Sequence, residues 1–368
     1  MSTARQRADR IIERFMNTVD SLITLRDPSG RDTARRMIQM LARADRDLSF
    51  RLRAASRRNG GPNASFTESS LLAYREQIQK TIEFAKGRLR GLTTEQAFRV
   101  ADIGYGMMGD FFTNLESEFT GSVVPIRLRE AKLLELKPTL LQRHMASVDR
   151  YGDQMIRQMN RILAQGIVQG KTQGQLVDDF VRLRGPRGTV SLKAIEIQPG
   201  MVIRISEEII PEGLFMRYRS WAWRIIRTET AEAQNAAHLE ATRGFRNQFP
   251  DLKKKILATF DQRTAFDSVG VHGQVRDIDK PFIDGAGRVY QRPPSRPHDR
   301  EIVIPWRTSW PNTDHSQPPT TKQLQSLNLT TKQRDLGRAI AMSERREQTS
   351  QRRYSAMARS PALPRMFR

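Results

Sequence analysis

The stretch RTETAEAQNAAHLEA, residues 227–241, combines alanine with regularly spaced polar side chains. Steps of three and four residues place one set of these polar side chains on a single face of a helix. The set is Arg227, Thr230, Gln234 and His238, with Glu229 and Asn235 beside it. Alanine lets another backbone approach closely. A polar face on an otherwise apolar helix therefore favours buried hydrogen bonds to a neighbouring segment over catalysis.

The surrounding residues extend this helix and add strands to it. We expect the helix to span about residues 212–249, followed by short apolar runs between Gly- and Pro-rich connections. These runs lie at 254–260, 287–291 and 300–305, and they are typical of strands in a small irregular sheet. Upstream, residues 189–210 alternate polar and apolar around a Pro-Gly turn, which predicts a β-hairpin.

The N-terminal half, residues 1–185, is predicted to be helical. Its first helix is broken near residues 26–32 by Pro and Gly, and a second spans residues 67–90. Thr93 and Gln96 have the spacing of a capping box, which predicts the start of a third helix there.

The most regular helix is expected at residues 139–168. Its apolar stripe recurs at three- and four-residue steps and indicates a buried seam. The stripe consists of Leu141, Met145, Val148, Met155, Met159 and Ile162. We expect His144, beside the stripe, to point to solvent. Thr172 and Gln175 then have the spacing of a cap that opens a short helix.

The fold class is therefore α+β and predominantly α-helical, in three parts. A helical region covers residues 1–185, a small α+β domain covers 186–310, and a basic extended or helical tail covers 311–368. From residue 321 onward there are 11 Lys/Arg against 3 Asp/Glu, which is typical of an arm that orders on a partner.

Composition limits the function classes. At 368 residues the chain is long enough for two or three domains. The net charge of +22 predicts a polyanionic partner, because each Lys or Arg on a phosphate releases a counterion. The absence of cysteine excludes disulfides, thiolate nucleophiles and thiolate metal sites. No run approaches the roughly 18 apolar residues of a membrane span, so we expect no membrane partner.

Three motifs occur in order along the chain: RTETAEAQNAA, then FDQRTAFDSVGVHGQV at 260–275, then PPSRPHDREIVIP at 293–305. Together, over about residues 210–310, they resemble the phage head morphogenesis family, the Mu F-like minor head proteins. That family shows an Arg-x-Glu helix with a downstream Asn, then Asp-x-Arg-Thr, then a Pro-rich motif before a final strand. The resemblance implies a fold-forming motif of Arg227, Glu229, Asn235, Asp261, Arg263, Thr264, His272 and Arg300.

The chain departs from that family at every thiolate position. Ala265, Ser268, Asp299 and Glu301 occupy the places of the family's cysteines, and Arg296 occupies the place of its histidine. Four thiolates could hold a structural zinc that staples a small sheet. Here we expect charge pairing instead, with Arg263 and Arg300 facing Asp299, Glu301 or Asp261. The motif is then a scaffold without metal or cofactor.

The resemblance implies a structural minor head protein of a tailed bacteriophage, located in the virion after assembly in the host cytoplasm. Its expected partners are the portal protein, packaged double-stranded DNA and other head proteins, and its role is head assembly, DNA packaging or genome delivery. We expect no catalytic residue. The residues expected to bind DNA are Arg345, Arg346, Arg352 and Arg353.

Two alternatives stay open. One is a non-specific DNA-binding internal protein that is ejected with the genome. The other is a metal-dependent nuclease or toxin that uses His272, His298, Asp299 and Glu301. Alternation along an extended segment would place Asp299 and Glu301 on one face and His298 on the other, which disfavours the nuclease.

Overall fold

A computed structural model describes residues 3–124, 128, 130–181, 189–198, 202–211, 215, 219–260, 266–284, 287–296 and 299–317. The chain forms two compact units. Unit 1 comprises the residues up to Arg26, Ala97–Thr139 and the residues from Arg227 onward; unit 2 comprises Asp27–Gln96 and Leu140–Ile226. This division differs from the expected boundary near residue 185, because α3, α4 and α7 each contribute to both units.

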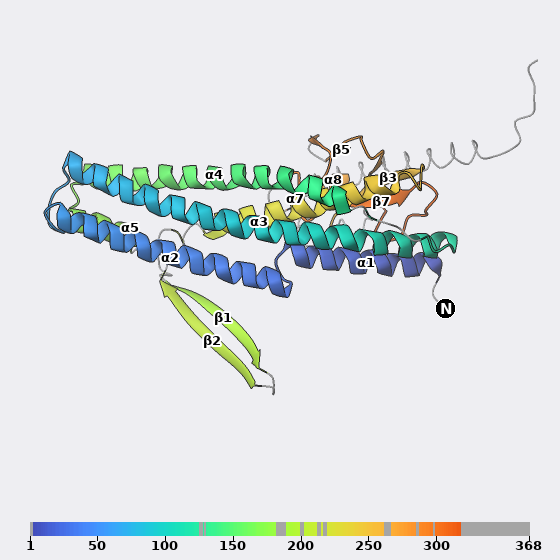
Figure 1. The fold of residues 1–368 in the computed structure, drawn as a ribbon, viewed down its shortest axis with the longest axis horizontal. Helices are drawn as coiled ribbons and strands as arrows, with labels where there is room; N and C mark the ends of the chain where they lie inside the picture. The colour runs from blue at the N-terminus through green and yellow to red at the C-terminus, as the bar shows by residue number, and fades with distance from the viewer. Residues whose placement is uncertain are drawn as a thin grey trace, which may run out of the picture. The chain divides into compact units, whose positions relative to one another are not determined.

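Unit 2 is mainly helical, as the sequence predicted. Within it, α2 and the first part of α3 run side by side in opposite directions, as Figure 1 shows. The expected β-hairpin is present, with Thr189 paired to Pro211 and Gln198 paired to Val202. The elements that contribute to this unit are α2 (Pro28–Arg58), α3 (Glu68–Thr120), α4 (Glu130–Val168), α5 (Gln173–Val181), β1 (Thr189–Gln198) and β2 (Val202–Pro211).

The prediction of a helix start at Thr93 was wrong, because α3 continues unbroken through this position. The Thr93 hydroxyl donates to the carbonyl of Leu89 at 2.8 Å, a bond within the helix that does not cap it. Gln96 is buried and accepts a hydrogen bond from the Thr33 hydroxyl of α2 at 3.1 Å. Thr93 and Gln96 thus have the spacing of a capping box, but both are buried residues in the middle of a helix. By contrast, the Thr172–Gln175 cap of α5 is confirmed.

The helix α4 buries a different face from the one predicted for its first half. Leu141 and Met145 remain 38% exposed, whereas Leu140 and His144 are buried. The expectation that His144 points to solvent was wrong. Burial, with the charge of Arg143, lowers the pKa of His144 to about 4, so the ring packs in its neutral form. Further along the helix Val148, Met155 and Met159 of the predicted stripe are fully buried, whereas Ile162 is half-buried and Leu163 is buried in its place.

Unit 1 packs helices against a three-stranded antiparallel sheet in the order β4-β3-β7. A second pair, β5 with β6, lies outside that sheet. The expected strands are thus present, although each is shorter or shifted by a few residues. The elements are α1 (Ala4–Ile23), α7 (Arg219–Phe245), β3 (Leu252–Leu257), α8 (Phe266–Val271), β4 (Val275–Arg276), β5 (Phe282–Ile283), β6 (Val289–Tyr290) and β7 (Ile302–Arg307).

Aromatic residues form the centre of unit 1. The ring of Phe112 on α3 lies 5.1 Å from Phe245 of α7 and 5.2 Å from Trp310, measured between centroids. The residues just after Trp310 also belong to this unit, since the His315 backbone N–H donates to Asp9 of α1 at 2.9 Å. Asp314 and His315 therefore contact α1, and Asn312 accepts from Lys255 of β3, in a stretch that we had assigned to the tail. None of the described helices is long and apolar enough to cross a membrane.

Candidate functional site

The polar face of α7 holds the outer edge of β7. The Asn235 amide nitrogen donates to the Glu301 carbonyl at 3.1 Å, and its oxygen accepts from the Val303 N–H at 2.8 Å. His238 Nδ1 lies 3.0 Å from the Val303 carbonyl. Since β3 occupies the other edge of β7, these side chains take the place of a missing neighbouring strand. The prediction of buried hydrogen bonding along this face is confirmed.

His238 acts here as a neutral donor. Burial lowers its pKa to about 3, and the contact with the Val303 carbonyl requires the proton on Nδ1. The other ring nitrogen, Nε2, can then accept from the Gln234 amide, which lies 2.5 Å away. Gln234 in turn fills the space beside Gly104 of α3, where a Cβ would lie 2.3 Å from the amide nitrogen. Hydrogen bonds therefore connect α7 to β7, and the Gln234 side chain at their end packs against α3 at Gly104.

A second buried polar cluster lies where the last motif meets α8. The Arg296 guanidinium donates to Asp299 at 2.5 Å and to the Ser268 hydroxyl at 2.9 Å. Asp299 also accepts from the Ser295 hydroxyl and from the Arg296 backbone N–H, each at 2.9 Å. We call Ser268, Arg296, Asp299 and Glu301 the motif cluster. Its members occupy positions where the resembling family carries cysteine or histidine.

Glu301 is the titrating member of the motif cluster. Burial and the charge of Asp299 raise its pKa to about 8, and the neighbouring Ser268 and Arg296 oppose that rise. The Tyr290 hydroxyl of β6 can donate to the Glu301 carboxyl at 3.4 Å. The carboxyl group is therefore held protonated at neutral pH, inside the fold and away from solvent.

The predicted motif residues do not all meet. His272 is buried beside β3: its Nδ1 accepts from the Ala258 N–H at 2.9 Å, and burial lowers its pKa to about 3. Arg300 pairs with Asp20 of α1 at 3.7 Å, while Asp299 is held by Arg296. The residue that binds Asp299 is thus Arg296, while the other expected partner, Asp261, lies outside the described residues.

Two further motif residues lie on α7 near its point of entry into unit 1. Glu229 is buried and Arg227 is partly buried. The expected motif residues Asp261, Arg263 and Thr264 lie outside the described residues, as does His298. The expected DNA-binding residues Arg345, Arg346, Arg352 and Arg353 also lie outside them.

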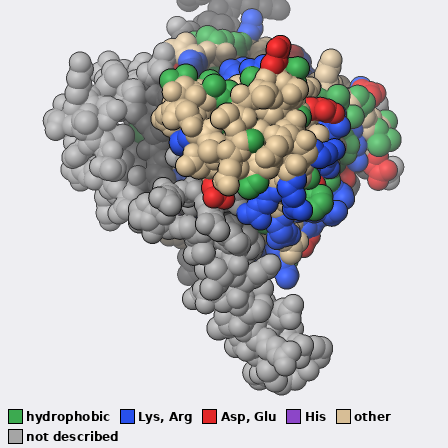
Figure 2. Space-filling model, turned by 90° about the vertical axis from the view of Figure 1, so that its left-hand side faces the viewer, with side chains coloured by type: hydrophobic (Ala, Val, Ile, Leu, Met, Phe, Trp, Pro, Cys, Tyr) green, Lys and Arg blue, Asp and Glu red, His purple; other side chains and the backbone are tan. Residues whose placement is uncertain are grey.

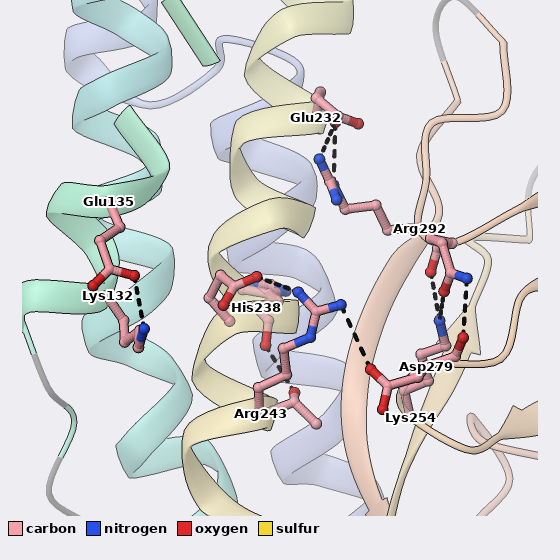
Figure 3. A network of polar contacts seen from close by, with 11 residues as sticks. Lys132, Glu135, Glu232, His238, Arg243, Lys254, Asp279 and Arg292 are labelled. Atoms are coloured by element: carbon pink, nitrogen blue, oxygen red, sulfur yellow. Dashed lines mark hydrogen bonds and ion pairs between the residues drawn. The ribbon is translucent and has the colours of Figure 1, made fainter. Parts of the chain in front are cut away.

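Sequence reasoning missed a third set of polar contacts that joins α7 to the strands. Figure 3 shows Glu232 and Arg243 reaching from α7 toward Arg292 and Asp279. Arg292 donates to Glu232 at 2.7 Å and 3.1 Å through two nitrogens. The buried Lys254 ammonium donates to the Gln291 carbonyl at 2.7 Å, and burial lowers its pKa to about 8. In the sequence, the sign of this contact was a lysine, Lys254, at the start of the apolar run predicted to be a strand.

The contacts described above are hydrogen bonds and charge pairs within the fold. Among the described residues, no group of three or more His, Cys, Asp or Glu side chains could hold a metal ion. Comparison with models of protein families, with curated proteins and with solved structures finds no match for this chain.

Proposed function

We propose that this chain is a structural, non-catalytic minor head protein of a tailed bacteriophage. It binds the portal and assists head assembly, DNA packaging or genome delivery. It resides in the capsid interior or at the portal vertex, after assembly in the host cytoplasm. Its partners are the portal protein and packaged double-stranded DNA, with other head proteins as further partners.

The observation that carries this proposal is the convergence of the motif cluster. Ser268 and Arg296 are 28 residues apart in sequence, yet they meet side by side with Asp299. A metal staple built from the corresponding cysteines and histidine would require the same convergence. The convergence therefore supports reading the three ordered sequence motifs as those of the head morphogenesis family, with the metal replaced by an ion pair.

The state of the two carboxyl groups supports a role in binding rather than turnover. Asp299 is buried and its carboxylate is occupied by Arg296, and Glu301 is buried beside it. A substrate phosphate could reach neither group without rearrangement of the fold. Such buried pairs fix a geometry while adding little net stability, which suits a scaffold.

Portal binding tests the proposal directly. The full chain would be mixed with assembled portal rings encoded by the same genome and analysed by sedimentation velocity at moderate salt. We expect a co-sedimenting complex of defined stoichiometry that survives nuclease treatment, which removes DNA as a bridge. A well-formed ring that sediments without the chain would contradict the proposal.

A DNA-binding internal virion protein is the second candidate, and the net charge of +22 favours it. This candidate predicts DNA affinity that falls steeply with salt, without any portal complex. The nuclease alternative predicts cleavage that a chelator abolishes and that Asp299→Asn removes while the melting temperature changes little.

A further inference from the structure

One face of α2 carries a row of exposed arginines. Their spacings of 8, 3, 7 and 4 residues keep them within a sector of about 80° around the helix, given about 3.6 residues per turn. The row contains no Asp or Glu; the positions between its arginines on this face are Gln39 and Phe50. We call Arg35, Arg43, Arg46, Arg53 and Arg57 the arginine row.

The arginines of the row differ from others on the same helix in their partners. Arg36 is bound by Glu95 at 2.7 Å, and Arg51 is bound by Asp47 at 2.6 Å. Among the residues that the structure describes, no carboxylate lies within ion-pair distance of any guanidinium in the row. The ion pairs of Arg36 and Arg51 therefore lie on the faces of α2 beside the row. The row remains available to an external anion.

A groove borders the N-terminal half of the row, between α2 and α3 in unit 2. It has a cavity volume of about 410 Å³ and is lined by Arg43, Arg88 and Phe84 among others. The Phe84 ring has the guanidinium of Arg43 5.6 Å from its centroid and that of Arg88 6.0 Å away. Both cations are therefore near the same ring, and a cation–π contact of this kind does not use up the N–H groups of a guanidinium.

The glycines of α3 show how open this groove is, although Gly106, elsewhere on the helix, is equally open and does not line it. Glycine weakens a helix, so its presence in mid-helix calls for a packing or functional cause. Gly104 accommodates Gln234, and Gly109 faces Leu128. Gly87 and Gly91 both line the groove, yet a Cβ at either position would meet nothing within 4 Å. The space that these two glycines leave open is therefore not used by the chain itself.

A second groove borders the other half of the row. Arg53 and Arg57 line it together with Asn63 and one carboxylate, Asp178, and its cavity volume is about 590 Å³. Figure 2 looks onto this end of unit 2 and shows Lys and Arg side chains gathered on its lower right, with hydrophobic side chains among them. Phe50, in the middle of the row, is 71% exposed and offers an apolar contact between the cations.

The length of the row selects the kind of polyanion. Arg35 and Arg57 are 22 positions apart, which corresponds to about 33 Å along a helix. One turn of duplex DNA rises about 34 Å, and duplex DNA is stiff over a far greater length. A stiff partner can meet all five cations of a rigid helix at once, whereas a flexible strand would first have to be ordered.

We propose that the arginine row of α2, with its two bordering grooves, binds the phosphate backbone of double-stranded DNA without sequence preference. The choice of DNA as the polyanion rests on the proposed function; the row and its grooves do not. The residues of this site differ from the C-terminal arginines that the sequence suggested, which lie outside the described residues.

The test compares two double variants of the full chain that lose equal charge. Arg46→Gln with Arg53→Gln alters the row, and Arg157→Gln with Arg161→Gln alters exposed positions of α4 in the same unit. Binding to a labelled duplex of about 20 base pairs is followed by fluorescence anisotropy between about 50 and 200 mM salt. We expect the row variant to bind more weakly and to reduce the slope of log K against log salt by about 1.8, or about 0.9 per lost phosphate contact. The α4 variant should match wild type.

Equal losses in both variants would overturn the proposal, because net charge alone would then explain binding. An unchanged slope in the row variant, or tighter binding to a single strand of the same length, would also overturn it. Urea midpoints equal to wild type would show that both variants fold. The row variant should still co-sediment with portal rings. Failure of wild type to bind portal, with row-dependent duplex binding intact, would refute the proposed function and leave this inference standing.

Discussion

Replacing Asn235 with alanine tests whether the edge of β7 is held by α7. The substitution removes the donor to the Glu301 carbonyl and the acceptor for the Val303 N–H, and both of these backbone groups are deeply buried. A buried polar group left without a partner costs about 1–3 kcal/mol. Two such groups predict a loss of about 2–6 kcal/mol in the free energy of unfolding, a large share of the roughly 5–15 kcal/mol typical of a domain.

Urea unfolding followed by tryptophan fluorescence is a suitable assay, because Trp306 and Trp310 are buried in the same unit as Asn235. The two units can unfold separately, so the comparison applies to the transition that these tryptophans report. Asn17→Ala on α1, at an exposed position, is the matched control and should change stability by less than about 0.5 kcal/mol. If Asn235→Ala unfolded within about 0.5 kcal/mol of wild type, the edge-holding role would be refuted.

Two further predictions concern burial. The pKa of Glu301 is raised from 4.5 to about 8 in the fold, so its contribution to stability is fully present below pH 4.5 and is lost as pH rises toward 8. Glu301→Gln should flatten this part of the stability profile in urea titrations at several pH values; a decline equal to that of wild type would contradict the assignment. Gly104→Ala should destabilise by about 1–3 kcal/mol, because the new Cβ would meet Gln234. Gly106→Ala, two residues away with nothing within 4 Å, should stabilise by about 0.5–1 kcal/mol in calorimetry. Equal shifts of both melting temperatures would refute the packing argument.

Burial in the interior of unit 1 could be predicted where the spacing of residues along a single helix was sufficient to show it. The spacing of Gln234 and His238 indicated a buried polar face on α7, and both side chains are fully buried there. The receiving segment could not be identified, because nothing in the local pattern states which backbone lies across from that face. The contact with Val303 joins residues 65 positions apart and depends on how the strands pair.

The predictions of helix boundaries and of buried helix faces were wrong where tertiary contacts bury a polar residue. Thr93 was predicted to cap a helix because its spacing to Gln96 is that of a cap, yet α2 supplies Thr33 to Gln96 in mid-helix. His144 was predicted to be exposed because histidine is polar, yet the ring is buried in its neutral form. In both cases the prediction used only the local sequence, whereas packing against other parts of the fold decides whether the side chain is buried.

The motif cluster balances its charges within a buried pocket. Arg296 supplies one positive charge to a pocket with two carboxyl groups, so it can neutralise only one of them fully. Asp299 receives that charge directly, and Glu301 keeps its proton at neutral pH as a consequence. The pocket is thereby close to neutral, which makes its burial tolerable. An ion pair together with a protonated acid can thus fix the position of β7 against α8.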